Sequence, residues 1–147
     1  MGTLVHIVAA EEDEIAYVGE SLQPLEEWSG ITRQGLDTAK IVMLHCLLTG
    51  DELDLALSLY EPVYVAEESG IVALRLADEA LQRLAEYDEE ALERVGEELA
   101  ATEEFELENW DEEDVLALVM DLADLARLAE AQGQVLLVWM YTGSNDA

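Results

Sequence analysis

The sequence predicts a single α+β domain in which a small mixed or antiparallel sheet packs in two layers against several helices. Three observations lead to this expectation. Short β-type segments open and close the chain, at residues 3–10 and 135–141. Between them, most apolar residues recur at helical spacing, with one further β-type segment in the middle. The last apolar run is unbroken, which is typical of a strand covered on both faces, so we expect it near the centre of the sheet.

The first third of the chain predicts one strand and two short helices. Residues 3–10 are apolar and rich in β-branched side chains, as in a strand. Residues 11–20 favour a short helix, and Pro24 fits the first turn of another. The segment from Ser29 through Gly35 is expected to be a loop, because two glycines interrupt it.

Residues 37–49 predict a buried helix. Asp37 is a suitable N-terminal cap, and Gly50 is a suitable stop. Between Lys40 and Asp51 the chain has no charged residue, and apolar side chains cover nearly the whole circumference. A helix that is apolar all round belongs inside the protein.

The middle of the chain continues with a helix over residues 53–60 and a short extended piece over 63–66. A strand then ends near Leu76. Along the chain, single strands therefore alternate with groups of helices. No repeat or long linker divides the chain. We expect one domain over residues 3–142, followed by a loose tail at 143–147.

The second half predicts three helices and the final strand. Asp78 should cap the first helix, and a second helix, with an acidic outer face, should begin near Asp88. A polar connection over residues 103–114 follows. Asp111 should cap the longest helix, which Gly133 ends before the last strand.

The charge is extreme for a folded domain. The chain has 35 acidic and 6 basic residues, a formal net charge of −29, yet 51% of its residues are hydrophobic. That apolar share argues against disorder and predicts a core beneath a negative surface. Such a surface repels phosphate groups, so we expect no direct binding of nucleic acid or membrane lipid.

The remaining features suggest a cytoplasmic location and no cofactor. A single cysteine cannot form an internal disulfide, and the first residues lack the basic start of a signal peptide. No apolar run approaches the ~20 residues that span a bilayer. The sequence has no zinc, calcium-loop, P-loop or nucleophile-elbow motif, so no catalytic, metal or cofactor site is predicted.

The helix over 37–49 carries a family resemblance. Its sequence resembles the YfbM-like family of uncharacterised bacterial proteins, in which a helix carries Leu-His-aromatic-Leu-Leu-Thr-Gly. The matching residues are Leu44, His45, Leu47, Leu48, Thr49 and Gly50. The strand and acidic-capped helix in GIVALRLADEALQRLAEYDEEAL and the ending through Gly133 are also similar to that family, so the resemblance covers roughly residues 3–142.

The resemblance implies an α/β two-layer fold and a bacterial origin, but no established activity. The chain also departs from the family pattern. Thr38 and Ala39 stand where the family has Asp-Lys, Ile41 stands where it has Trp, and Cys46 replaces an aromatic residue. If the family's polar residues serve a common site, part of that site is lost here.

Three polar residues are candidates for a functional role. His45 has no carboxylate at helical spacing, so the simplest interpretation is a buried ring that hydrogen-bonds within the core. Lys40 is the only lysine. Arg75 lies in an apolar strand and should have a carboxylate partner. Cys46 lies mid-helix among apolar residues, where a thiol behaves as a small hydrophobe.

The connection over residues 103–114 is the candidate interaction segment. It places Phe105 and Trp110 among acids that include Glu108 and Asp111. Aromatic residues surrounded by acids suit the recognition of a basic partner, although both rings could instead pin the connection to the core.

Three hypotheses remain open at this point. The favoured one is a non-enzymatic acidic domain that binds a basic protein, in an inhibitor or immunity role among others. The second is a ligand pocket or small active site beside the helix 37–49 that uses His45; a closed, water-free environment around His45 would reject it. The third is that the charge only adapts the surface to salt. The oligomeric state is not predicted.

Overall fold

The computed structural model describes residues 4–21, 23–68 and 70–141, and it confirms the α+β class. A five-stranded sheet has the order β2-β1-β5-β4-β3, and every neighbouring pair is antiparallel. The last strand of the chain is the central one, as its unbroken apolar sequence predicts. The strands are β1 (Leu4–Ala10), β2 (Gly30–Gln34), β3 (Tyr64–Ala66), β4 (Ile71–Arg75) and β5 (Val135–Tyr141).

The central strand explains the division of the core. In β5, side chains alternate between the two faces of the sheet, and all but the last residue are buried. Leu136, Val138 and Met140 join the larger core, whereas Leu137 and Trp139 join a smaller one. The strand is therefore covered on both sides.

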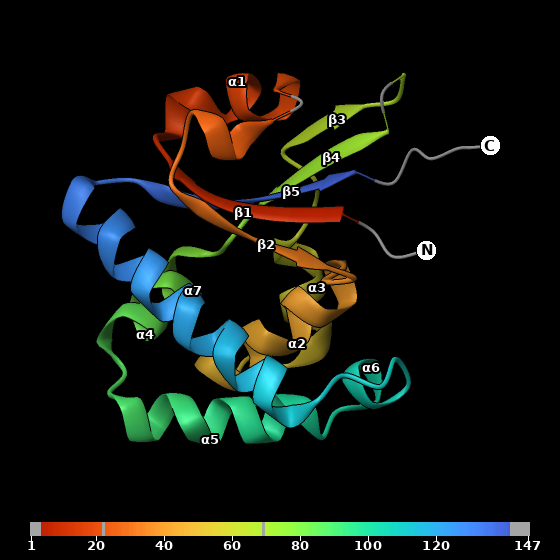
Figure 1. The fold of residues 1–147 in the computed structure, drawn as a ribbon, viewed down its shortest axis with the longest axis vertical. Helices are drawn as coiled ribbons and strands as arrows, with labels where there is room; N and C mark the ends of the chain where they lie inside the picture. Colours follow the sequence, from red (N-terminus) through yellow and green to blue (C-terminus); the bar gives the residue numbers. More distant parts are fainter. Residues whose placement is uncertain (1–3, 22, 69, 142–147) are drawn as a thin grey trace.

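Most helices cover one face of the sheet (Figure 1). The longest helix, α7, crosses this face. Helices α5 and α6 lie on the side of α7 that points away from the sheet. The helices of this layer are α2 (Thr38–Thr49), α3 (Leu53–Leu59), α4 (Asp78–Glu86), α5 (Glu89–Ala100), α6 (Glu103–Glu106) and α7 (Glu112–Gln132).

The opposite face carries a smaller cover that the two-layer expectation leaves out. It consists of α1 (Ile15–Glu20) and two 3-10 turns, η1 (Glu12–Glu14) and η2 (Pro24–Glu26). Val18 of α1 is fully buried in the smaller core, and the indole N–H of Trp139 donates to the Ser21 carbonyl. Part of the second face is thus closed as well.

Helix ends follow the local signals at Asp37, Gly50, Asp88, Asp111 and Gly133, but not at Asp78. The Asp37 side chain accepts the amide N–H of Lys40, and Gly50 ends α2 at φ 82°. Asp88 likewise caps α5. The predicted cap at Asp78 is wrong: Ala77 occupies that position, and Asp78 is the first helical residue, where its carboxylate binds Arg75.

Two elements were not predicted. The segment expected to be a loop contains β2, an edge strand in which Ile31 contacts the larger core and Thr32 is exposed. The connection over 103–114 contains the single turn α6. The expected tail at 143–147 lies outside the described residues. In the part that is described, no helix has the length and apolar character to cross a membrane.

Candidate functional site

A buried chain of polar groups surrounds His45. The ring is fully buried on α2, and its Nδ1 lies 3.0 Å from the Tyr60 hydroxyl. Its Nε2 lies 2.8 Å from an oxygen of Asp51. Tyr60 is 4% exposed and follows α3, whereas Asp51 follows the glycine that ends α2. Both nitrogens of the ring are therefore engaged.

The hydrogen bonds assign the direction of this chain. The Asp51 carboxylate can only accept, so His45 Nε2 carries a hydrogen and donates to it. Nδ1 then accepts from the Tyr60 hydroxyl, whose oxygen also accepts the amide N–H of Ala77. The hydrogen bond from His45 is the main cause that lowers the pKa of Asp51, and burial raises the pKa of Tyr60 to about 12.

This arrangement joins elements rather than exposing a reactive group. It ties α2 to the end of α3 and to the start of α4. No ring nitrogen has a lone pair free for a substrate, and the imidazole is out of contact with solvent. This closed environment is the condition that rejects the hypothesis of a pocket that uses His45. The ring is buried and hydrogen-bonded, as the simplest interpretation of the sequence has it, and its carboxylate partner, Asp51, reaches it from beyond the helix end rather than from helical spacing.

Cys46, the neighbouring residue, is partly exposed and packs against the larger core. Burial, together with the negative charge of Asp51, raises the pKa of its thiol. Both effects keep the sulfur protonated, so this cysteine lacks the low pKa of a nucleophile.

Lys40 is the one fully buried cation among the described residues, and it holds the 103–114 connection to α2. Its ammonium lies 2.9 Å from Glu108 and 3.5 Å from Asp37. It also lies 5.8 Å from the centre of the Phe105 ring. The structure thus brings together two predicted site residues, Lys40 and Glu108, that are distant in sequence.

One of the predicted interaction residues, Phe105, is not accessible to a partner. Phe105 is fully buried and packs edge to face against Trp110, with ring centres 5.0 Å apart. It therefore cannot touch a partner directly. Trp110 is partly buried against the core, whereas Asp111 is exposed. The aromatic pair thus pins the connection to the core, one of the two roles that the sequence allows.

Arg75 has the carboxylate partners that its position in an apolar strand requires. Its guanidinium binds Glu12 and, at 2.9 Å, Asp78. Burial alone would lower the pKa of Arg75, but the bonds to these carboxylates outweigh it and raise the pKa. Glu12 belongs to the small cover on one face and Asp78 to α4 on the other, so Arg75 clamps both around the sheet.

Exposed acids gather on three consecutive elements. Residues 89–114 contain thirteen acids and one base, Arg94. All but the half-buried Glu104 are exposed, on α5, α6, the start of α7 and the turn before it, which lie together at one end of the molecule (Figure 1). We call this surface the α5–α7 acidic face. Leu107, which is 80% exposed, lies within it.

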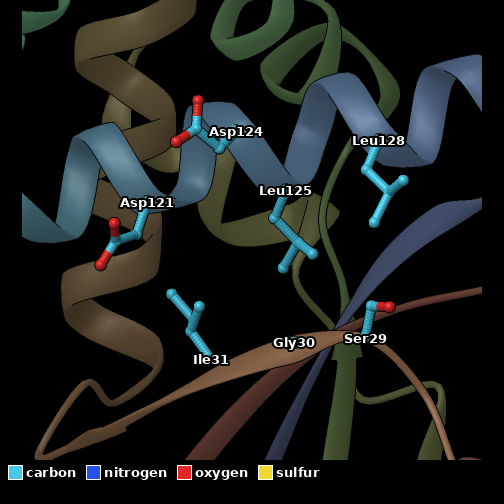
Figure 2. Close-up of a pocket in the computed structure, with 7 residues that line it drawn as sticks. All are labelled: Ser29, Gly30, Ile31, Asp121, Asp124, Leu125 and Leu128. Atoms are coloured by element: carbon cyan, nitrogen blue, oxygen red, sulfur yellow. The ribbon is translucent and has the colours of Figure 1, made fainter.

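A hollow of about 370 Å³ lies between β2 and α7 (Figure 2). Leu125 and Leu128 point from α7 toward the strand. The two acids at its rim are already paired, Asp121 with Arg33 and Asp124 with Arg127. Within the described residues, no group of three potential metal ligands comes together. The hollow is therefore a mostly apolar groove whose two acids already have partners.

Comparisons with known proteins give a structural likeness and no activity. No protein-family model matches the chain, and no curated protein matches it. Among solved structures, the chain is similar to the crystal structure of a protein of unknown function, YfbM from Escherichia coli. The similarity covers 93% of this chain and 99% of that one, at a TM-score of 0.48 and 16% identity. The solved protein bears the name of the family that the LHCLLTG motif and its neighbours resemble.

Proposed function

We propose that this chain is a non-enzymatic acidic interaction domain that binds a basic protein through the α5–α7 acidic face. The observation that carries the proposal is the density of exposed acids on that face, with Leu107 exposed among them. An inhibitor of a basic protein is one function that such a surface serves.

Electrostatics supports this assignment. On α5 the outer carboxylates follow one another at helical spacing, and the α7 start adds Glu112, Glu113 and Asp114. Like charges held this close focus a negative potential, which raises the rate at which a cationic partner arrives. Leu107 gives that partner an apolar contact to desolvate, since charge alone contributes more to the rate of association than to affinity.

Salt adaptation is the second candidate, and one observation favours it. Exposed acids also occur on the opposite side of the sheet, for example Glu11, Glu12 and Asp13. The only lysine is buried, so the described surface has arginine as its only strong cation. A surface that serves solvation alone would show no difference between its acidic regions.

The test compares two pairs of neutralising substitutions. One variant carries Glu97→Gln and Glu106→Gln on the α5–α7 acidic face; its control carries Glu20→Gln and Glu27→Gln on the other side of the sheet, where both residues are also exposed. Each tagged protein is used to recover partners from a nuclease-treated lysate of the source cell at low and high salt.

A basic protein that wild type and control recover in stoichiometric amount at low salt, and that the Glu97/Glu106 variant loses, supports the proposal. Equal recovery by both variants, or binding that high salt leaves unchanged, contradicts it. No recovery by any of the three proteins favours salt adaptation.

A further inference from the structure

A second surface has the opposite character, because it is apolar. The sequence of α3 is LDLALSL, and all four of its leucines are about half exposed: Leu53 49%, Leu55 52%, Leu57 48% and Leu59 47%. Two valines just after it, Val63 and Val65, are 44% and 53% exposed. On α3, Leu55 and Leu59 lie on one flank and Leu53 and Leu57 on the other. We call Leu55, Leu59, Val63 and Val65 the α3–β3 apolar patch.

Leu59 and Val63 join the two elements. Leu59 and Val63 line the same hollow of about 310 Å³, together with the aliphatic and charged groups of Arg75, Ala77 and Asp78. Val65 lies opposite Val72 in the β3–β4 pair, and Val72 packs on the larger core. Val65 therefore faces the same side of the sheet as α3.

The patch is not needed to close the core. Ala56 and Tyr60 already present the buried side of α3 to the interior, at 0% and 4% exposure. On a helix of seven residues, the leucines at four-residue spacing occupy the flanks of that buried side. Grouped leucines on the surface of so polar a protein mark a binding surface more often than isolated exposed leucines do.

Exposed acids lie next to the patch in the sequence, and their charge indicates which kind of partner binds it. Glu52, Asp54, Glu61, Glu67 and Glu68 are all exposed, and no basic residue occurs between positions 51 and 70. We propose that the α3–β3 apolar patch binds a cationic amphipathic segment of another protein, with its apolar side chains on the leucines and its lysines or arginines toward these acids.

The same charges disfavour two other occupants. A second copy of the chain would bring Glu52, Asp54 and Glu61 toward the same acids of its partner, at −29 net charge per chain. An anionic membrane surface would be repelled by them in the same way. Complementary charge therefore selects a basic protein segment over either.

This surface is separate from the α5–α7 acidic face, so the two proposals can fail independently. Binding at the acidic face depends on Glu97 and Glu106 and does not require α3. Binding at the patch depends on leucines that the acidic-face variant leaves unchanged.

The experiment uses a labelled peptide of leucine and lysine, patterned as an amphipathic helix, and a scrambled peptide of the same composition. Binding to the full chain is followed by fluorescence anisotropy over a range of salt. The patch variant carries Leu55→Gln and Leu59→Gln, because glutamine is polar and a good helix former. Leu25→Gln is the matched control, since it removes an exposed leucine from η2, on the other side of the sheet and outside both proposed surfaces.

We expect the patterned peptide to bind at least about tenfold more tightly than the scrambled one, and the patch variant to lose about tenfold or more in affinity. Leu25→Gln should bind as the wild type does, and added salt should weaken binding. A second variant, Asp54→Asn with Glu61→Gln, keeps the leucines and should reduce affinity at low salt. Unchanged thermal unfolding midpoints verify that the variants are folded.

Equal binding of the peptide to wild type and to both patch variants overturns the proposal. So does a concentration-dependent dimer that Leu55→Gln with Leu59→Gln abolishes, measured by sedimentation, because the occupant would then be a second copy. Binding to anionic vesicles without binding to the patterned peptide also overturns it.

Discussion

The substitution Tyr60→Phe tests the buried chain around His45 at its central atom. The Tyr60 hydroxyl accepts from the Ala77 amide at 3.1 Å and lies 3.0 Å from His45 Nδ1. Removing it leaves both partners without a hydrogen bond beside a side chain that is 4% exposed. A buried polar group without a partner costs about 1–3 kcal/mol. Two such groups, one of them on the partly buried Ala77, predict a loss of about 3 kcal/mol in the free energy of unfolding.

Urea unfolding at fixed salt measures this difference, provided that the slope of the transition does not change. Tyr17→Phe is the control, because it removes the same atom from a ring that is 66% exposed and should change the free energy by less than about 0.5 kcal/mol. Combining Tyr60→Phe with His45→Leu should give a smaller loss than the sum of the single losses. Equal stability of Tyr60→Phe and Tyr17→Phe would refute this account of the chain.

Three more predictions follow from other parts of the molecule. Because the hydrogen bond from His45 lowers the pKa of Asp51 in the folded state, ionised Asp51 stabilises the fold above its unfolded pKa, and this contribution is lost as pH falls through the folded pKa. Asp51→Asn should therefore show a smaller acid-induced drop in thermal midpoint than the wild type. Gly19→Ala would place a methyl group on the ring of Tyr64 and should lower the free energy of unfolding by about 1–3 kcal/mol in urea titrations. Added salt should raise the thermal midpoint of the wild type, because it screens repulsion at a net charge of −29; a constant midpoint would argue against self-repulsion.

The elements that the sequence predicts correctly depend on neighbouring residues. Asp37 and Gly50 bound α2 because a cap and a left-handed stop act within one turn of the helix. The unbroken apolar run of β5 places it at the centre because each of its faces must be covered. The sequence does not predict β2 for two reasons. An edge strand pairs on one side only, and the five residues of β2 include a glycine, a threonine and an arginine, so they form no apolar run.

The candidate site depends on contacts that no local pattern encodes. Lys40 is buried only because Glu108, on a distant connection, folds over α2 and supplies a carboxylate. Asp51 reaches His45 because Gly50 turns the chain back over the last turn of the helix. The contact between Asp51 and His45 could have been predicted from the sequence, because an acid directly after the glycine that ends a helix lies near the last turn of that helix. Asp37, three residues before Lys40, is a local partner, but nothing near Lys40 in the sequence identifies Glu108.

The dependence on salt distinguishes salt adaptation from a docking role of the negative surface, but only if stability and binding are measured on the same samples. Any protein at a net charge of −29 gains stability when salt screens its self-repulsion, so a rising thermal midpoint fits both salt adaptation and a docking role. Binding to a cationic partner changes in the opposite direction, because the same ions screen the attraction. A domain that becomes more stable while it releases a basic protein therefore has surface acids engaged in recognition. The Glu97/Glu106 variant and its Glu20/Glu27 control then locate those acids, because both change the self-repulsion by the same formal charge.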